Sequence, residues 1–272
     1  MPSYCGGGPH VAAPSPNGIA YSDVADFARW KAISTTERFD NGTMRIILGN
    51  PVAAQAIRDG HTNPWPKGAI FAKVALDQLP DSSGEIHAGA FRQVEFMIRD
   101  NDKYAATDGW GFARWVGGLA MQPYGKDAGF VNECVNCHQT MADYDHVFTF
   151  PLADTNSLYD QVITTMVDHR THSMSTLYGN DAAVKSARSG ASAYPPGSAL
   201  ALVTWSQRDD PHWFGGRIPQ TLLSVESLRY LPGAAPSYEY YAGTPLAKKL
   251  PLESGVPARI TYISRQKAAV LP

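Results

Sequence analysis

Five consecutive residues near the middle of the chain, Cys134-Val135-Asn136-Cys137-His138, have types and spacing that could carry chemistry. C-x-x-C-H is the attachment signature of a c-type haem, in which two thiols form thioethers to the haem and the adjacent histidine ligates the iron. On a helix, residues three and four apart share a face, so both thiols and the imidazole could reach one porphyrin. The motif predicts one covalent haem c per chain, with His138 as a ligand of its iron.

Two other chemistries use similar residues. A structural zinc site requires four ligands, and the chain has three cysteines and no second Cys/His pair at a suitable spacing. A redox C-x-x-C pair is expected in a thioredoxin-like βαβ setting, which the surrounding sequence does not indicate. Haem attachment is therefore the preferred interpretation.

The composition is that of an ordinary globular protein. The chain has 272 residues, of which 44% are hydrophobic and 18% are charged, and its formal net charge is -2. This balance gives no basic surface for nucleic acid, which is therefore not an expected partner. No apolar run approaches the roughly 18 residues needed to cross a bilayer, so no transmembrane segment is expected.

Haem attachment to this motif takes place outside the cytoplasm, so we expect a periplasmic or otherwise extracytoplasmic protein. Residues 1–8 have neither the basic nor the apolar region of an export signal, and we expect that signal to have been removed or left out. Cys5 is left over once the other two cysteines hold the haem, and it could stay free, pair with another chain or carry lipid. Residues 1–18, rich in Gly, Pro and Ser, are predicted to be a flexible lead-in.

Hydrophobic periodicity predicts the elements that position the motif. Apolar residues at helical spacing predict a helix in 21–33, and Asn50 and Pro51 begin another that ends at Gly60. A further helix should start near Asp127 and carry the C-x-x-C-H motif. Alternating apolar residues predict strands at 43–48, 69–76, 91–98, 110–116 and 147–152. The predicted fold class is α+β, with a mainly antiparallel sheet and packed helices.

Three charged residues, Arg45, Lys73 and Glu95, each lie on the less apolar face of its predicted strand. The opposite faces look suited to packing on helices. Two interpretations of the charged face stay open. It is simply solvated, as is usual on one side of an antiparallel sheet, or it forms a wall of the haem pocket.

The second half of the sequence repeats the first. Met44-Arg-Ile-Ile-Leu-Gly-Asn50 is echoed by Met174-Ser-Thr-Leu-Tyr-Gly-Asn180, and similar helical stretches follow both asparagines. Such self-similarity at a nearly constant offset, 130 residues between Asn50 and Asn180 and within one residue of that elsewhere, predicts a tandem duplication. We expect two similar domains, a haem-binding domain at 19–152 and a degenerate copy at 158–272.

The two copies differ at the positions where chemistry is expected. No cysteine follows Cys137, Ser175 stands in place of Arg45, and Leu202 stands in place of Lys73. Among the three charged residues only Glu95 keeps its counterpart, which is Glu226. The second domain is therefore expected to hold no haem and to have a structural or partner role.

One loop of the second copy is unusually aromatic. The stretch 205–216 contains Asp209-Asp210-Pro211-His212-Trp213-Phe214, which predicts a hairpin loop with exposed aromatic side chains. Such a loop could form an interface with the first copy or with another protein.

Residues 19–152 resemble the cytochrome P-460 family, which is related to the cytochromes c′-beta. The resemblance is carried by Met44-Arg45, Gly68-Ala-Ile-Phe-Ala-Lys73, Val94-Glu95, Glu133-Cys-Val-Asn-Cys-His138 and Asp145-His-Val-Phe-Thr-Phe150. It implies a mainly antiparallel sheet, a haem-bearing helix, and a five-coordinate iron whose distal site is open to small nitrogen species. Members of the family mostly form homodimers, so the duplication suggests a pseudo-dimer within one chain, with further oligomerisation left open.

The resemblance also implies roles for single residues. The cysteines and histidine of the motif would be the thioether anchors and the proximal iron ligand. Lys73 stands where P-460 proteins have a lysine joined covalently to the porphyrin edge, Glu95 matches a distal carboxylate that handles protons, and Arg45 matches a distal arginine. Each of the three has an ordinary alternative: Lys73 as a surface lysine, Glu95 as a cross-strand salt-bridge partner, and Arg45 as a surface residue.

The leading functional hypothesis is an oxidoreductase that uses haem iron to oxidise hydroxylamine to nitrous oxide or nitric oxide and passes electrons to a partner such as a c-type cytochrome. Glu95 and Arg45 are the catalytic candidates, and desolvation beside the haem should raise the pKa of Glu95. Two alternatives stay open. One is a non-catalytic protein that binds nitric oxide or carbon monoxide. The other is an electron carrier with a sixth iron ligand, for which Met97 is a candidate and Met141 lies too close to His138.

Overall fold

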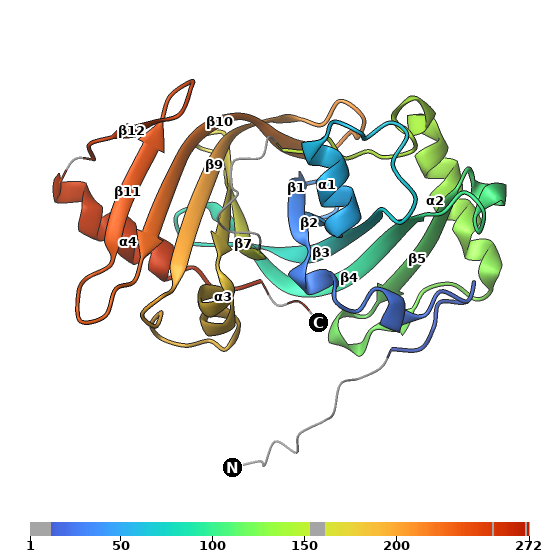
Figure 1. Cartoon of the computed structure of the whole chain (residues 1–272), viewed down its shortest axis with the longest axis horizontal. Helices are drawn as coiled ribbons and strands as arrows, with labels where there is room; N and C mark the ends of the chain where they lie inside the picture. The colour runs from blue at the N-terminus through green and yellow to red at the C-terminus, as the bar shows by residue number, and fades with distance from the viewer. Residues whose placement is uncertain (1–11, 153–160, 252, 270, 272) are drawn as a thin grey trace, which may run out of the picture.

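The computed structural model describes residues 12–152, 161–251, 253–269 and 271. Its main element is a single antiparallel sheet (Figure 1). The strands of the first half are β1 (Lys31–Arg38), β2 (Thr43–Gly49), β3 (Ile70–Pro80), β4 (Glu85–Arg99), β5 (Trp110–Val116) and β6 (Gln122–Pro123). The strands of the second half are β7 (Gln161–Asp168), β8 (Ser173–Gly179), β9 (Ala199–Asp209), β10 (Gly216–Arg229), β11 (Ser237–Ala242) and β12 (Ala247–Lys249).

The two halves join at two places in this sheet. β4 pairs with β7, and β10 pairs with β1, so β1–β4 and β7–β10 form a closed ring of neighbouring strands. β5 extends the sheet from β4, and β11 and β12 extend it from β10. The α+β prediction, with a mainly antiparallel sheet, is confirmed at this level.

The α-helices of the described residues cover the outside of the ring, and they are α1 (Pro51–Arg58), α2 (Val131–His138), α3 (Asp181–Arg188) and α4 (Val256–Ser264). Helices α2 and α4 lie at opposite ends of the molecule (Figure 1). Asn50 caps α1 as predicted, because its side chain accepts a 3.0 Å hydrogen bond from the Ala53 amide and Pro51 occupies the first turn. Among the described residues, no helix is long and apolar enough to cross a bilayer.

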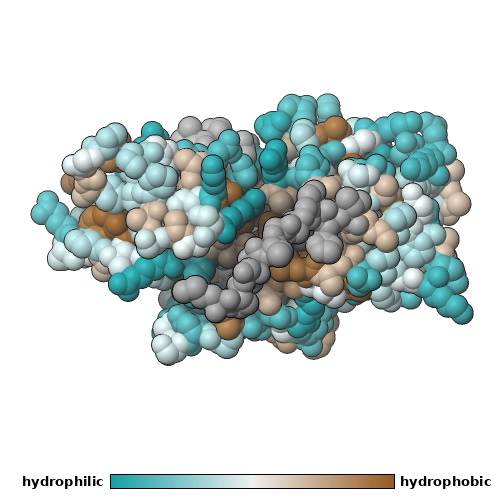
Figure 2. All heavy atoms as spheres, turned by 90° about the horizontal axis from the view of Figure 1, so that it is seen from below, coloured by the Kyte–Doolittle hydropathy of each residue, from teal (hydrophilic) through white to brown (hydrophobic). Residues whose placement is uncertain are grey.

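Apolar side chains from both halves meet inside the ring. Met44, Ile46 and Val74 belong to the same buried cluster as Val203 and Trp205. These first-half residues lie on the strand faces opposite the charged residues. The expectation that those faces pack on helices was therefore wrong, because closing the sheet gives them the other half of the chain to pack against. On the outer face seen in Figure 2, hydrophobic residues form small separate groups among polar ones.

Several predicted elements are confirmed and two are wrong. β2 and β5 match their predicted spans closely, and α2 carries the motif. The helix expected at 21–33 is instead two short 3-10 turns, Tyr21–Asp23 and Phe27–Arg29, followed by the start of β1. The stretch 147–152 forms no strand and contacts the sheet through one backbone bond, from the Leu152 amide to the Ile33 carbonyl (2.9 Å).

The second half repeats the register of the first as well as its strand order. Lys73 pairs with Glu95 across β3 and β4, and the matching positions in β9 and β10 pair Leu202 with Glu226. The two junctions between the halves are matched in the same way, with Arg38 opposite Gly216 and Asp168 opposite Glu85. This is the arrangement that the predicted duplication would produce. Its domain boundaries stay a prediction, and residues 153–160 and Cys5 lie outside the described residues.

The end of the predicted lead-in is packed against the sheet. The Trp115 indole donates a 2.9 Å hydrogen bond to the Ala13 carbonyl, and the Asn17 side chain donates a 2.8 Å bond to the Phe112 carbonyl. Ser15, between them, is buried. Residues 12–18 are therefore held on β5. The prediction that this part of the lead-in is flexible was wrong.

Candidate haem site

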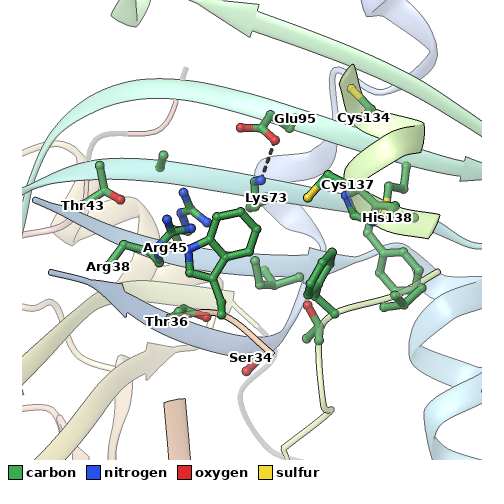
Figure 3. Close-up of a pocket in the computed structure, with 18 of the residues that line it drawn as sticks. Ser34, Thr36, Arg38, Thr43, Arg45, Lys73, Glu95, Cys134, Cys137 and His138 are labelled. Carbon is green, nitrogen blue, oxygen red and sulfur yellow. Dashed lines mark ion pairs between the residues drawn. The ribbon is translucent and has the colours of Figure 1, made fainter. Parts of the chain in front are cut away.

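The residues of the C-x-x-C-H motif face a cavity of about 520 Å³, which is within the range of cofactor sites. Cys134, Cys137 and His138 line one side of it from α2, because their spacing places them on one helical face. The facing wall is the outer surface of β2, β3 and β4, from which Arg45, Lys73 and Glu95 project (Figure 3). The charged face is thus a pocket wall and not a simple solvated surface.

The geometry of His138 suits an iron ligand. Its Nδ1 donates a 2.7 Å hydrogen bond to the His146 carbonyl, which fixes the proton on Nδ1 and leaves the Nε2 lone pair free. Burial lowers the pKa of His138 to about 4, so the imidazole is neutral at pH 7. The rings of Phe112 and Phe148 lie 5.3 and 5.1 Å from the imidazole and restrict its orientation.

The loop that supplies this carbonyl is anchored by Asp145. Its buried carboxylate accepts a 2.7 Å bond from the Trp65 amide and a 3.4 Å bond from the Trp110 indole, and it pairs with Arg99 at 3.4 Å. Asp145 and His146 both adopt left-handed backbone conformations, with φ of 48° and 66°. The sequence placed Asp145 in a stretch that resembles the family but predicted no role for it. The structure places it as the residue that fixes the turn after α2.

Both cysteines of the motif are free and half-buried. Burial, with a further contribution from Glu95, raises the pKa of Cys134 to about 11, so this sulfur is a protonated thiol at neutral pH. A thiol is the form that adds across a vinyl group to give a thioether. Among the described residues, the one cluster with metal-ligand spacing is Asp81, Glu85 and His87, away from α2, so the structure offers the motif no set of four zinc ligands.

Lys73 and Glu95 form an ion pair at the centre of the sheet wall, with Nζ 2.5 Å from Oε2 (Figure 3). Gln93 donates a 2.5 Å bond to the other carboxylate oxygen, and Arg114 lies 3.9 Å away. Burial would raise the pKa of Glu95, but attraction to Lys73 and Arg114 outweighs it and lowers this pKa to about 2. The predicted raised pKa is therefore wrong for this arrangement, because the prediction considered desolvation and not the facing lysine.

Arg45 faces the cavity from β2. In the part of the chain that the structure describes, it forms no ion pair, and its Nε is buried without a hydrogen bond. Burial, strengthened by repulsion from Arg38, lowers the pKa of Arg45 to about 10, so it remains a cation at neutral pH. It is not the ordinary surface arginine of the alternative interpretation. Met97, the candidate sixth ligand, also lines the cavity, whereas Met141 is buried and is not among the lining residues.

In the second half the same face of the sheet is filled. Leu202, at the position of Lys73, packs in a buried cluster that includes Ile263 of α4. Glu226 accepts bonds of 2.8 and 2.5 Å from Arg259 of α4, and 2.6 Å from the Tyr238 hydroxyl. Helix α4 and its arginine thus occupy the side of the sheet that is an open cavity in the first half.

A sheet face and a C-x-x-C-H helix thus enclose one cavity, which is the arrangement expected of a haem-binding sheet protein. Residues 24–149 match the family model described as cytochrome P460. The first half of the chain therefore belongs to the cytochrome P460 family, and membership implies a haem-iron cofactor. The match ends before the second half, and no curated protein matches the chain.

Proposed function

We propose that the chain is a periplasmic c-type haem protein that oxidises hydroxylamine, with one haem c held by Cys134, Cys137 and His138. The observation that carries this proposal is the shared cavity, which has the C-x-x-C-H helix on one side and the half-buried Glu95 carboxylate with three nearby cationic side chains on the other. Bound haem would accept the electrons of a small nitrogen substrate and pass them to a partner such as a c-type cytochrome. Proton transfer and the holding of substrate would fall to side chains that line the cavity.

Glu95 is proposed to take up the protons that oxidation of hydroxylamine releases. With a pKa of about 2, it is a weak base as long as Lys73 is an ammonium ion. If the Lys73 amine is instead joined to the porphyrin edge, its positive charge is lost and burial dominates the pKa of Glu95, which rises. Lys73 would thus control how strongly Glu95 binds a proton, and Arg45 would hold anionic groups in the cavity.

A second candidate function is reversible binding of nitric oxide or carbon monoxide without catalysis. The low pKa of Glu95 favours it, because a carboxylate tied to a free Lys73 ammonium is a poor proton acceptor. The two functions differ in the state of Lys73, which mass analysis of haem peptides and an optical spectrum can determine. A six-coordinate low-spin spectrum would reject both and support the electron carrier with Met97 as ligand.

The decisive experiment expresses the full chain in a host that matures c-type cytochromes and measures hydroxylamine oxidation with an artificial electron acceptor. Glu95→Gln should retain the haem and lose turnover by about a hundredfold or more, the size of effect typical of general acid–base catalysis. Glu226→Gln, at the matching register position of the second half, is the control and should keep turnover. Full turnover in Glu95→Gln would reject the role of Glu95, and a chain purified without covalent haem would reject the proposal as a whole.

We also propose that the second half takes the place of a partner subunit. The exchanged strand pairs β1–β10 and β4–β7 and the matched registers support an intrachain pseudo-dimer.

A further inference from the structure

The cavity of the first half is lined in part by the second half. Asp210, Trp213, Ile218 and Pro219, from the end of β9 to the start of β10, all face it. We propose that this hairpin is a lid on the site, and that Trp213 sets the size of the molecules that can enter. The proposal rests on the proposed haem site in the first half, and it assigns a specificity-determining residue to the half that has no haem motif.

Trp213 is held in place by contacts with two separate segments of the first half. Its ring lies 4.1 Å from the Arg38 guanidinium and 5.8 Å from the ring of Phe148, which in turn packs on His138. Its side chain also lies close enough to the Asp40 carboxylate, which is paired with Arg38, to help lower the pKa of that carboxyl group. The indole is therefore fixed between the β1–β2 turn and the segment that follows α2.

The backbone of the hairpin is also fitted to this place. Gly215 has φ of +88°, and a Cβ atom there would lie 2.5 Å from Cβ of Asp40. The Asp40 amide bonds to the Gly215 carbonyl at 3.4 Å, and Gly216 pairs with Arg38 in the sheet. His212 adds a ring contact on the other side, stacked on Phe150 at 5.3 Å. A larger residue at position 215 would push the hairpin away from the first half.

The matching hairpin of the first half, between β3 and β4, has no aromatic residue at its tip. Residues 81–84, between β3 and β4, read Asp-Ser-Ser-Gly and carry no aromatic side chain. The corresponding face of the second half is covered by α4 in the part of the chain that the structure describes. The aromatic hairpin thus occurs at the end of the pair where the cavity is open. This asymmetry points to a role in the site and not to a general need of the fold.

The consequence is steric selection. A half-buried indole fixed at a cavity wall admits molecules of a few atoms, such as hydroxylamine, and hinders branched ones. Adding or removing a few carbon atoms at the wall of such a pocket changes the ratio of the rates for a larger and a smaller ligand about ten- to a hundredfold.

The test measures association of carbon monoxide and of tert-butyl isocyanide with the reduced, haem-loaded full chain by stopped flow. Trp213→Ala should raise the ratio of the isocyanide rate to the carbon monoxide rate about tenfold or more, and Trp213→Phe should raise it less. Phe214→Ala is the control, because that neighbouring ring is 96% exposed, and it should leave the ratio unchanged. Gly215→Ala should displace the hairpin and reproduce the effect of Trp213→Ala without altering the indole itself.

An unchanged ratio in both Trp213→Ala and Gly215→Ala would overturn the lid, and so would an equal rise in Phe214→Ala. Hydroxylamine turnover is measured separately on the same proteins. Turnover with an unchanged ratio rejects the lid and leaves the proposed function standing. A raised ratio without any turnover rejects hydroxylamine oxidation and leaves the lid standing.

Discussion

Replacing Glu95 with glutamine should destabilise the folded protein by an amount that depends on pH. The Glu95 pKa falls from its ordinary value of 4.5 to about 2, which corresponds to about 3 kcal/mol of stabilisation when the carboxylate is ionised. Its side chain is 26% exposed, so most of this interaction is shielded from solvent. With Lys73 as a free ammonium ion, we expect Glu95→Gln to lower the free energy of unfolding by about 3 kcal/mol at pH 7.

The direction of the pH dependence follows from the lowered pKa. A carboxylate whose folded-state pKa is depressed contributes stability above its unfolded-state pKa of about 4.5, and this contribution is lost as the pH falls towards 2. The difference between the wild type and Glu95→Gln should therefore shrink from about 3 kcal/mol at pH 7 to about 1 kcal/mol at pH 3. Other carboxylates titrate in this range too, but they do so in both proteins and cancel in the difference.

Urea unfolding at the two pH values, at one ionic strength, measures this difference. Lys73→Met and the double variant complete a cycle that isolates the Lys73–Glu95 coupling from the loss of either group alone. A difference that is the same at pH 7 and pH 3 would refute the assigned pKa. A wild type that is less stable than Glu95→Gln at pH 7, with a deficit that disappears as the pH falls, would show that the native pKa of Glu95 lies above its unfolded-state value, as expected once the Lys73 charge is removed.

Two further predictions concern the supports of the site. Asp145→Ala should cost about 3 kcal/mol of unfolding free energy, because it leaves Arg99 buried without its carboxylate, and loosening the His146 carbonyl should alter the visible haem spectrum. Asn50→Ala should cost about 1 to 2 kcal/mol in urea unfolding through loss of the α1 cap, and Asn180→Ala at the matching cap of α3 should cost about as much. An unchanged haem spectrum in Asp145→Ala would contradict the role of Asp145 in fixing the His146 carbonyl. Unchanged stability in Asn50→Ala or Asn180→Ala would contradict the assigned helix cap.

The sequence predicted best where structure depends on near neighbours. β2 and β5 alternate regularly, and the Asn50-Pro51 cap acts within one helical turn, so these features could be read directly. The sequence predicted least well those elements whose environment is provided by the other half of the chain. β1 contains Thr35 and Glu37, both fully buried, because this strand lies between β2 and β10. Buried polar residues at such a junction hide the alternation that identifies a strand.

In the candidate site, too, features set by nearby residues could be predicted and features set by contacts between distant segments could not. The C-x-x-C-H spacing was sufficient to predict the helical wall of the cavity. The shared face of the three charged residues left open whether that face was solvated or formed the other wall, and the structure places it at the cavity. The pKa of Glu95 could not be predicted, because it depends on Lys73 lying directly opposite across β3 and β4. The sequence predicted the aromatic hairpin as an interface with the first copy or with another protein. It could not place Trp213 at the cavity, because nothing in the order of residues shows that this side chain faces the other half.

The comparison between the halves also separates two roles for the carboxylate at the centre of the sheet. Glu226 has a cation from α4 in place of a lysine from β3, so this position needs a positive partner even where no haem motif exists. A salt bridge at Glu95 is thus no argument against chemistry there. What differs is access: the Glu226 side chain is 6% exposed and closed off by Arg259, whereas Glu95 is 26% exposed towards the cavity. Under the proposed function, only the carboxylate of the first half would be within reach of a small molecule in the cavity.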